Sequence, residues 1–338
     1  MPRIVLREPV GTMFDSWHQT AAGLARVYWL GTLPLPPSLA ELADALASCE
    51  TELREVAPAA PDVAADSPFW LIDPAGELGR VVGAAGATAV VIDASVRLAA
   101  LLPTPAPAAV MSVAMRLHQA STPAVVQAQA PVLLLERLVE PGLCQALIDH
   151  WRLGEKRADG VASAAGASVA DADVKRRRDV ALDDVRLYGP LRDCLVRRVM
   201  PAILQAFQSR IVRIEAPRIG CYDAATGGWF RCHRDNTTAY TAHRQFALSL
   251  NLNAGDEYDG GELRFREFGR QLYRPAAGGG LVFSCSLLHE VMPVTRGRRF
   301  GVFTFLHDEG HDAQYRRLIA EARARGLAGV RMRDPKAH

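Results

Sequence analysis

The chain has 338 residues, of which 49% are hydrophobic and 22% are charged, and its mean hydropathy is +0.02. These values are typical of a globular protein of about two domains, and without a long apolar run they argue against a membrane span. The formal net charge of +2, from 39 basic and 37 acidic residues, is too small to indicate nucleic-acid binding.

The N-terminal stretch and the cysteines both indicate a cytoplasmic protein. The opening MPRIVLREPVGTMFDSW has neither the apolar core nor the cleavage site of a secretory signal. The six cysteines form no CxxC pair, so neither a zinc knuckle nor a disulfide framework is predicted. We expect reduced and mostly buried thiols.

The first part of the chain is typical of a small α/β domain. Short apolar strands are predicted within residues 24–33, 68–84 and 87–102, separated by helical stretches and a DPAG turn. A Pro/Ala-rich segment and a helix that ends near residue 119 lead out of it. We therefore predict one domain at residues 1–120 and a linker at 121–130.

The second part, residues 131–338, has a different pattern. It begins with a predicted strand at 132–139, a helix at 140–153 and a small-residue loop at 160–173. From residue 211 onward, short apolar runs alternate with turn residues, which predicts an antiparallel sandwich or barrel. A basic helix is predicted from Asp312.

The stretch FRCHRDN, residues 230–236, contains a histidine and an aspartate one residue apart. Because a strand alternates its side chains, His233 and Asp235 are predicted to project from one face. His289 follows 54 residues after Asp235, and Arg299 ten residues after His289. Two histidines and one carboxylate on a β scaffold can hold Fe(II) and leave an open face. Arg299 could then pair with the carboxylate of a 2-oxo acid.

The stretch from about 211 to 309 resembles the iron- and 2-oxoglutarate-dependent dioxygenases, in particular the bacterial PKHD-type and prolyl 4-hydroxylase-like branch. HRDN, DEYDGGELRF and LVFSCSLLHEVMPVTRGRR carry the resemblance, which extends more loosely upstream to about residue 130. It implies His233, Asp235 and His289 as ligands of Fe(II) and Arg299 as the anchor of 2-oxoglutarate. It also implies O2 as a substrate and ascorbate as a candidate reductant. Arg298 is predicted to point to the opposite side of its strand.

Other residues near these motifs are assigned from the same resemblance. Tyr222 matches a tyrosine whose hydroxyl can reach the co-substrate, and half-buried packing is its alternative. Asn251 stands where some relatives place a tyrosine toward 2-oxoglutarate. The resemblance therefore does not decide which residue binds 2-oxoglutarate together with Arg299. Gly260 and Gly261 are predicted to form a tight turn. The remaining histidines of the region are interpreted as surface residues: His243, His307 and His311.

Residues 68–103 resemble the later part of a peroxiredoxin-like thioredoxin fold. Such enzymes attack peroxide with a thiolate in the loop after the first strand, but the corresponding segment 33–42 contains no cysteine, and Cys49 is predicted on a later helix. A non-catalytic domain used for packing, dimerisation or substrate presentation is therefore favoured over a peroxidase.

We expect an α+β protein: a double-stranded β-helix (jelly-roll) oxygenase domain preceded by a smaller α/β thioredoxin-like domain. Its predicted reaction is hydroxylation of an unactivated C–H bond in an amino acid, free or within a peptide or protein, with prolyl first. A hydroxylase of a small natural product and a non-catalytic binding protein are the alternatives. Neither nucleic acid nor a membrane is expected as a partner. The sequence leaves undecided whether the chain forms a homodimer.

Overall fold

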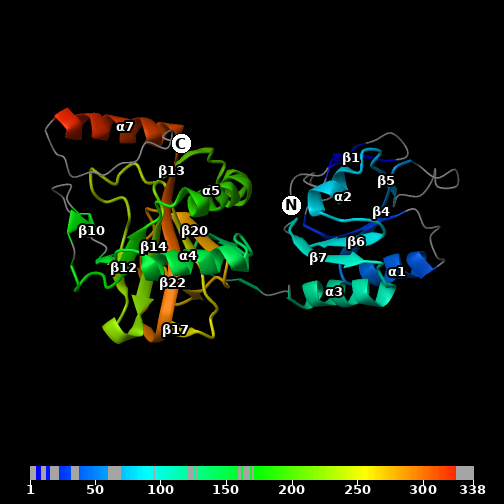
Figure 1. Ribbon diagram of the computed structural model, residues 1–338, viewed down its shortest axis with the longest axis horizontal. Coiled ribbons are helices and arrows are strands. Elements are labelled where there is room, and N and C mark those ends of the chain that lie inside the picture. The colour runs from blue at the N-terminus through cyan, green and yellow to red at the C-terminus, as the bar shows by residue number, and fades with distance from the viewer. Residues whose placement is uncertain are drawn as a thin grey trace. The chain divides into compact units, whose positions relative to one another are not determined.

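The computed structural model describes residues 5–8, 13–15, 23–31, 38–59, 70–94, 96–120, 125–126, 128–158, 161–162, 168–169 and 171–324. The chain divides into two compact units, residues 1–125 and 126–338 (Figure 1). The division lies within the segment 121–130 that the sequence predicts as a linker.

The N-terminal unit contains one sheet in the order β2-β1-β5-β4-β3-β6-β7. β3 pairs in parallel with β4, and β4 with β5, whereas β6 runs antiparallel to β3 and β7. The alternation of buried and half-buried positions along β4 is typical of a strand with one face in the core and the other face partly covered. The strand bounds are β1 Val5–Arg7, β2 Met13–Asp15, β3 Ala25–Leu30, β4 Thr51–Ala57, β5 Trp70–Ile72, β6 Thr88–Ile92 and β7 Leu98–Pro103.

Helices pack on both faces of this sheet (Figure 1). α1, Ser38–Ala47, and α3, Pro107–Ala120, contribute Leu46 and Val110 to one apolar cluster. α2, Glu77–Val82, contributes Leu78 to the cluster on the other face. The mixed sheet and its helices form the α/β domain that the sequence predicts, and the specific likeness to thioredoxin stays a prediction.

Cys49 does not lie on a helix, contrary to the sequence prediction. α1 ends at Ala47, and the backbone amide of Cys49 donates to the carbonyl of Leu46 at 2.9 Å in the turn that follows. Glu50 then takes a positive φ of 51°, which stops the helix. Of the segment 33–42, residues 33–37 lie outside the described residues.

The C-terminal unit is built on two sheets. The larger has the order β8-β20-β16-β22-β14-β12-β9, and β13 and β17 also pair with β22. The smaller has the order β15-β21-β18-β19. The bounds are β8 Val132–Leu135, β9 Arg157–Ala158, β12 Arg178–Ala181, β13 Ile211–Ile214, β14 Arg218–Asp223, β15 Phe230–His233, β16 Phe246–Asn251, β17 Tyr258–Gly260, β18 Leu263–Arg264, β19 Leu272–Tyr273, β20 Gly280–Ser284, β21 His289–Val291 and β22 Val294–Asp308.

An aromatic core lies between these two sheets. Both contribute buried side chains to it, including Tyr222, Tyr258, Phe265, Phe283 and Val291. Two antiparallel sheets that face each other across one core form the double-stranded β-helix that the sequence predicts.

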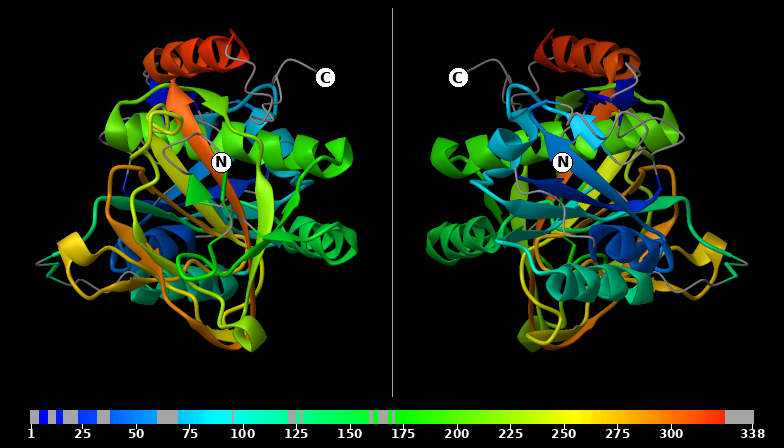
Figure 2. Two further views of the ribbon diagram at one scale, coloured as in Figure 1. Left: turned by 90° about the vertical axis from the view of Figure 1, so that its left-hand side faces the viewer. Right: turned by 90° about the vertical axis from the view of Figure 1, so that its right-hand side faces the viewer.

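A helical layer covers the other face of the large sheet (Figures 1 and 2). It consists of α4, Pro141–Leu153, and a continuous run that the sequence does not predict: α5, Val185–Cys194, the π-helical η1, Leu195–Val199, and α6, Met200–Phe207. Trp151 of α4 packs edge-on against Phe300 of β22. Two short 3-10 turns, η2 Ala224–Thr226 and η3 Arg266–Phe268, complete the unit together with α7, Glu309–Ala324, which follows β22 directly.

The predicted loop at 160–173 contains a small hairpin instead. β10, Val161–Ala162, pairs antiparallel with β11, Ser168–Val169. The sequence of this segment is rich in alanine and glycine, which are weak strand formers, so no strand pattern could be predicted. Among the described helices of the chain, none combines the length and the apolar run needed to span a bilayer.

Glu55 gives the N-terminal unit a pH-dependent stability. It lies on β4 between Trp29 and Trp70 of the neighbouring strands, and it is 4% exposed. Burial raises the pKa of its carboxyl from 4.5 to about 7. The unfolded chain therefore ionises before the folded chain does, and stability falls as the pH rises from about 4.5 to 7.

We expect Glu55→Gln to stabilise the protein by about 1 to 3 kcal/mol at pH 8 and to have little effect near pH 4.5, since each pKa unit corresponds to about 1.4 kcal/mol. Urea denaturation of the full chain at both pH values measures this. Asp44→Asn, an exposed site on α1, is the matched control. An equal effect of Glu55→Gln at the two pH values would contradict the assignment.

Candidate metal centre

Two histidines from different strands face each other on the small sheet. β15 and β21 pair antiparallel, and His233 and His289 are direct cross-strand partners. Asp235 follows the end of β15, where its backbone amide donates to the carbonyl of Cys285 at 2.9 Å. One potential ligand atom from each of the three side chains lies within 4.8 Å of the other two. The structure thus brings together the three residues that the sequence singles out.

Backbone carbonyls fix the orientation of both imidazole rings. His233 Nδ1 lies 2.7 Å from the carbonyl oxygen of Arg231, and His289 Nδ1 lies 2.9 Å from that of Leu287. A carbonyl oxygen only accepts, so each Nδ1 carries the proton and each Nε2 carries a lone pair. Backbone bonds of this kind are how proteins orient histidines that bind metals.

The two lone pairs point toward the Asp235 carboxylate. His233 Nε2 lies 3.3 Å from Asp235 Oδ1, and His289 Nε2 lies 3.5 Å from Asp235 Oδ2. His233 Nε2 is buried and forms no hydrogen bond with any described residue. Three electron-pair donors that face one another repel unless a cation lies between them. Two neutral imidazoles and one carboxylate are the donor set of the Fe(II) facial triad, so these residues fit that metal.

The charges at the site favour metal binding near neutral pH. Burial alone would raise the pKa of Asp235, but His289 and His233 hold it well below its usual range. Burial lowers the pKa of His289 to about 4. The carboxylate is therefore ionised and the His289 imidazole is neutral at pH 7, which is the state in which both can act as ligands.

Arg299 lies in the core between the sheets, whereas Arg298 faces outward. Arg299 is 1% exposed, and its guanidinium donates to the carbonyl of Gly261 at 2.8 Å and to Ser249 Oγ at 3.0 Å. Arg298 is 59% exposed and forms an ion pair with Asp223 at 2.7 Å. The two arginines alternate as a strand requires. Gly261 has a φ of +71°, and a Cβ there would meet the Arg299 side chain at 3.0 Å, so the predicted turn also makes room for the arginine.

Tyr222 is suited to a role beside Arg299, but Asn251 is not. Tyr222 is the cross-strand partner of Arg299, is 1% exposed, and accepts a long hydrogen bond from Arg177 at 3.4 Å. The amide nitrogen of Asn251 donates to the carbonyls of Asn253 and Pro275, and its oxygen accepts from Tyr258 at 3.1 Å. Its amide is fully used within the fold, so the expected contact of Asn251 with 2-oxoglutarate is not supported.

Two further residues near the centre carry no sequence signal. Ser249 holds the Arg299 guanidinium. The ammonium of Lys175 lies 4.3 Å from the centroid of the Phe230 ring, and that ring stacks on His233 with centroids 3.5 Å apart. Lys175 reaches the site because it bridges to Phe230 across the sheet, and such long-range pairing cannot be read from the local sequence.

The interpretation of three histidines as surface residues is wrong for two of them. His243 is 4% exposed and His307 is fully buried. Only His311, whose side chain is 38% exposed, lies near the surface. His307 is on a central strand whose inward face the sequence does not identify, and His243 is covered by Tyr315 of α7.

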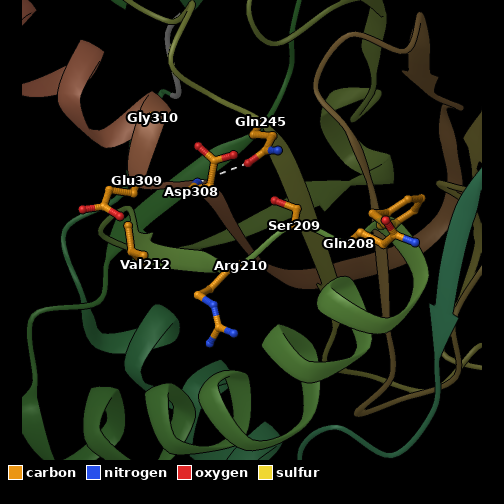
Figure 3. Close-up of a pocket in the computed structure, with 9 residues that line it drawn as sticks. Gln208, Ser209, Arg210, Val212, Gln245, Asp308, Glu309 and Gly310 are labelled. Carbon is orange, nitrogen blue, oxygen red and sulfur yellow. Dashed lines mark hydrogen bonds between the residues drawn. The ribbon is translucent and has the colours of Figure 1, made fainter.

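A hollow of about 410 Å³ lies elsewhere on the C-terminal unit (Figure 3). It is formed where α6 leads into β13 and where β22 leads into α7, and Gln245 bonds there to the backbone amide of Asp308 at 3.1 Å. Its walls include neither a triad residue nor Arg299. This hollow therefore says nothing about the substrate of the metal centre.

Comparisons with known proteins agree with this geometry. Residues 218–307 match the 2OG-Fe(II) oxygenase superfamily. A PKHD-type hydroxylase of Acidovorax ebreus (strain TPSY) is 32% identical over 165 residues, which are 46% of this chain and 70% of that protein. A PKHD-type hydroxylase of Synechococcus sp. (strain JA-2-3B'a(2-13)) is 30% identical over 136 residues, or 36% of this chain. The chain spans only 60% of the length of that relative.

A solved structure gives a weaker likeness. It is a prolyl hydroxylase in complex with a hypoxia inducible factor oxygen degradation domain peptide fragment from Trichoplax adhaerens. It aligns with a TM-score of 0.44 and 16% identity, over 55% of this chain and 87% of that one.

We expect the purified chain to bind one Fe(II), and His233→Ala, Asp235→Ala and His289→Ala each to abolish stoichiometric binding, because two remaining ligands cannot hold the metal. Anaerobic titration with metal analysis measures it. Arg234→Ala is the matched control, since Arg234 lies between two ligands but pairs outward with Glu267. Full iron occupancy in all three ligand variants would rule the centre out.

Proposed function

The chain belongs to the 2OG-Fe(II) oxygenase superfamily, and from this premise we propose that it is an Fe(II)- and 2-oxoglutarate-dependent dioxygenase that hydroxylates an unactivated C–H bond. The observation that carries the proposal is the lone-pair geometry of His233, Asp235 and His289, with the buried guanidinium of Arg299 in the same core. When bound, iron, 2-oxoglutarate and O2 supply the oxidation, and 2-oxoglutarate leaves as succinate and carbon dioxide.

Each residue of the chain has a distinct task in this proposal. The triad holds the metal from one side and leaves the other side open. Arg299 receives the distal carboxylate of 2-oxoglutarate. Two of its five N–H groups are held by Gly261 and Ser249, so the guanidinium is already oriented before the anion binds. Tyr222 and Phe303 lie beside the guanidinium and exclude water, which strengthens its attraction for an anion.

The neighbouring Arg177 is a poorer anchor. It is buried beside the same two rings, but it forms a forked ion pair with Asp179, with distances of 2.7 and 2.6 Å. Its charge is already compensated, so an incoming carboxylate would have to displace Asp179. Among the described residues, no carboxylate pairs with Arg299 in this way. The difference supports Arg299 as the residue that binds 2-oxoglutarate.

The substrate is proposed to be an amino acid, free or within a peptide or protein, with a prolyl residue as the first candidate. This rests on the resemblance of the motifs to the PKHD-type and prolyl 4-hydroxylase-like branch. We propose that the reaction belongs to the C-terminal unit. The N-terminal unit is proposed to have no redox turnover, since the segment where a peroxidatic cysteine would lie has none. The cytoplasmic location expected from the sequence stays a prediction.

The proposed reaction predicts iron-dependent turnover of 2-oxoglutarate. The full chain, given Fe(II), 2-oxoglutarate and a library of proline-containing peptides, is expected to form succinate and one peptide product heavier by one oxygen atom. With ¹⁸O2, the label should enter that product. The control is Asp235→Ala, which is expected to give neither succinate nor product. Iron-loaded protein that never consumes 2-oxoglutarate, with or without substrate, would contradict the proposal and favour a binding protein.

Replacing the guanidinium of Arg299 should weaken the binding of 2-oxoglutarate and leave the binding of the metal unchanged. We expect Arg299→Lys to weaken 2-oxoglutarate binding by about 2 to 4 kcal/mol, because the ammonium cannot replace a bidentate partner in a buried site. Isothermal titration of the iron-loaded protein under anaerobic conditions measures it. Arg298→Lys, on the exposed side of the same strand, should change little. A larger loss in Arg298→Lys would assign the anchor to the other arginine.

A further inference from the structure

A second cluster of two histidines and one carboxylate lies in the C-terminal unit. Glu215 follows β13, His243 precedes β16, and His307 lies near the end of β22. One potential ligand atom from each lies within 4.8 Å of the other two. None of these residues belongs to the triad of His233, Asp235 and His289. The second cluster is therefore separate from the triad, and its residue types and spacing fit a metal ion.

Three of the four ring nitrogens in this cluster form no hydrogen bond with a described residue. His307 is fully buried, and neither of its ring nitrogens forms a hydrogen bond with a described residue. The Nδ1 atom of His243 is also buried without one. The rings lie 5.2 Å apart at 85°. A buried ring nitrogen without a partner destabilises the fold, and a bound cation would satisfy one of the two on His307.

Arginine side chains orient the two carboxylates around the cluster, as outer partners do in metal sites. Glu215 accepts a fork from Arg244, with both distances 3.0 Å, and its Oε1 lies 2.9 Å from His243 Nε2. Behind His307, Asp312 Oδ1 lies 3.4 Å from Nε2, and Arg213 and Arg316 pair with that carboxylate. Outer partners of this kind orient metal ligands and leave lone pairs of the ligand free.

We propose that Glu215, His243 and His307 bind one zinc ion, at a site distinct from the iron centre. Two imidazoles and one glutamate are an established zinc donor set, and a fourth position would remain for water. Only one ligand is anionic, and three arginines lie behind the carboxylates, which disfavours the hard cations Ca²⁺ and Mg²⁺. His243 gives up its bond to Glu215, and both groups turn their lone pairs to the metal.

Zinc at this site would stabilise one end of the C-terminal unit. Its ligands come from three separate segments, and Tyr315 of α7 packs on both histidine rings, with centroids 4.6 and 5.5 Å away. Zinc bound here would link the end of β13, the approach to β16 and the end of β22 under the first turns of α7. A metal bound only by the folded state stabilises that state.

The test uses the full chain with His233→Ala and His289→Ala, because the iron centre could itself take up zinc. Equilibrium dialysis against buffered zinc, with metal analysis, is expected to give one zinc per chain. Replacing zinc by Co²⁺ should produce the intense visible absorption of a four-coordinate ion. Adding His307→Gln should lower zinc affinity by more than about 100-fold, beyond the 10- to 100-fold typical of outer partners. His311→Gln, the exposed neighbour, should change nothing.

Two outcomes would overturn the site. One is a folded parent variant that takes up no zinc and shows no Co²⁺ absorption. The other is a folded His307→Gln chain that keeps the affinity of its parent, with circular dichroism as the check of folding. If His307→Gln does not fold, His243→Gln decides by the same criterion. Zinc should also raise the melting temperature of the parent by several degrees and leave that of the ligand variant unchanged. A purely structural hydrogen-bonded cluster would show no such dependence.

Discussion

The antiparallel pairing of β15 with β21 is the constraint on which the metal centre depends. It places His233 directly opposite His289, and the irregularity in β15 between Phe230 and His233 sets that register. A bulge of this kind re-aims side chains at the edge of a sheet. A shift of one residue would turn one histidine to the other face. The ring orientations are set locally, since each Nδ1 is bonded to a carbonyl two residues earlier on its own chain segment.

The buried guanidinium of Arg299 is the second constraint. Burial of a cation without a charged partner is costly, and the groups that Arg299 contacts by hydrogen bonds, Gly261 and Ser249, are neutral. The fold accommodates the guanidinium in two ways. Gly261 takes a positive φ that other residues adopt only with strain, and Ser249 is small enough to face the core. An anion bound to the remaining N–H groups of Arg299 would compensate this charge, which is the role proposed above for 2-oxoglutarate.

The sequence predicts the parts of this fold that depend on local pattern. Alternating apolar positions predict the strands of the barrel, and the one-residue spacing in HRD predicts that His233 and Asp235 share a face. Properties that depend on long-range register are not predicted. The sequence places Asn251 at the co-substrate, yet its amide bonds to Asn253, Tyr258 and Pro275, and Pro275 lies 24 residues away in the sequence. The helical run from α5 to α6 was missed because a proline and a glycine interrupt its pattern.

The two histidine clusters show why one metal site can be read from a sequence and the other cannot. In the triad, His233 and Asp235 lie within one short motif. The motif identifies two ligands, and only the third, His289, has to be found elsewhere in the sequence. In the second cluster, Glu215, His243 and His307 come from three segments, and each one alone reads as an ordinary polar residue. The signal is physical: both ring nitrogens of His307 and Nδ1 of His243 are buried without a hydrogen bond to a described residue, beside a carboxylate that pairs with Arg244. A buried imidazole that forms no hydrogen bond with the described residues is the signal to follow, because a bound cation can use the lone pair that the fold leaves unused.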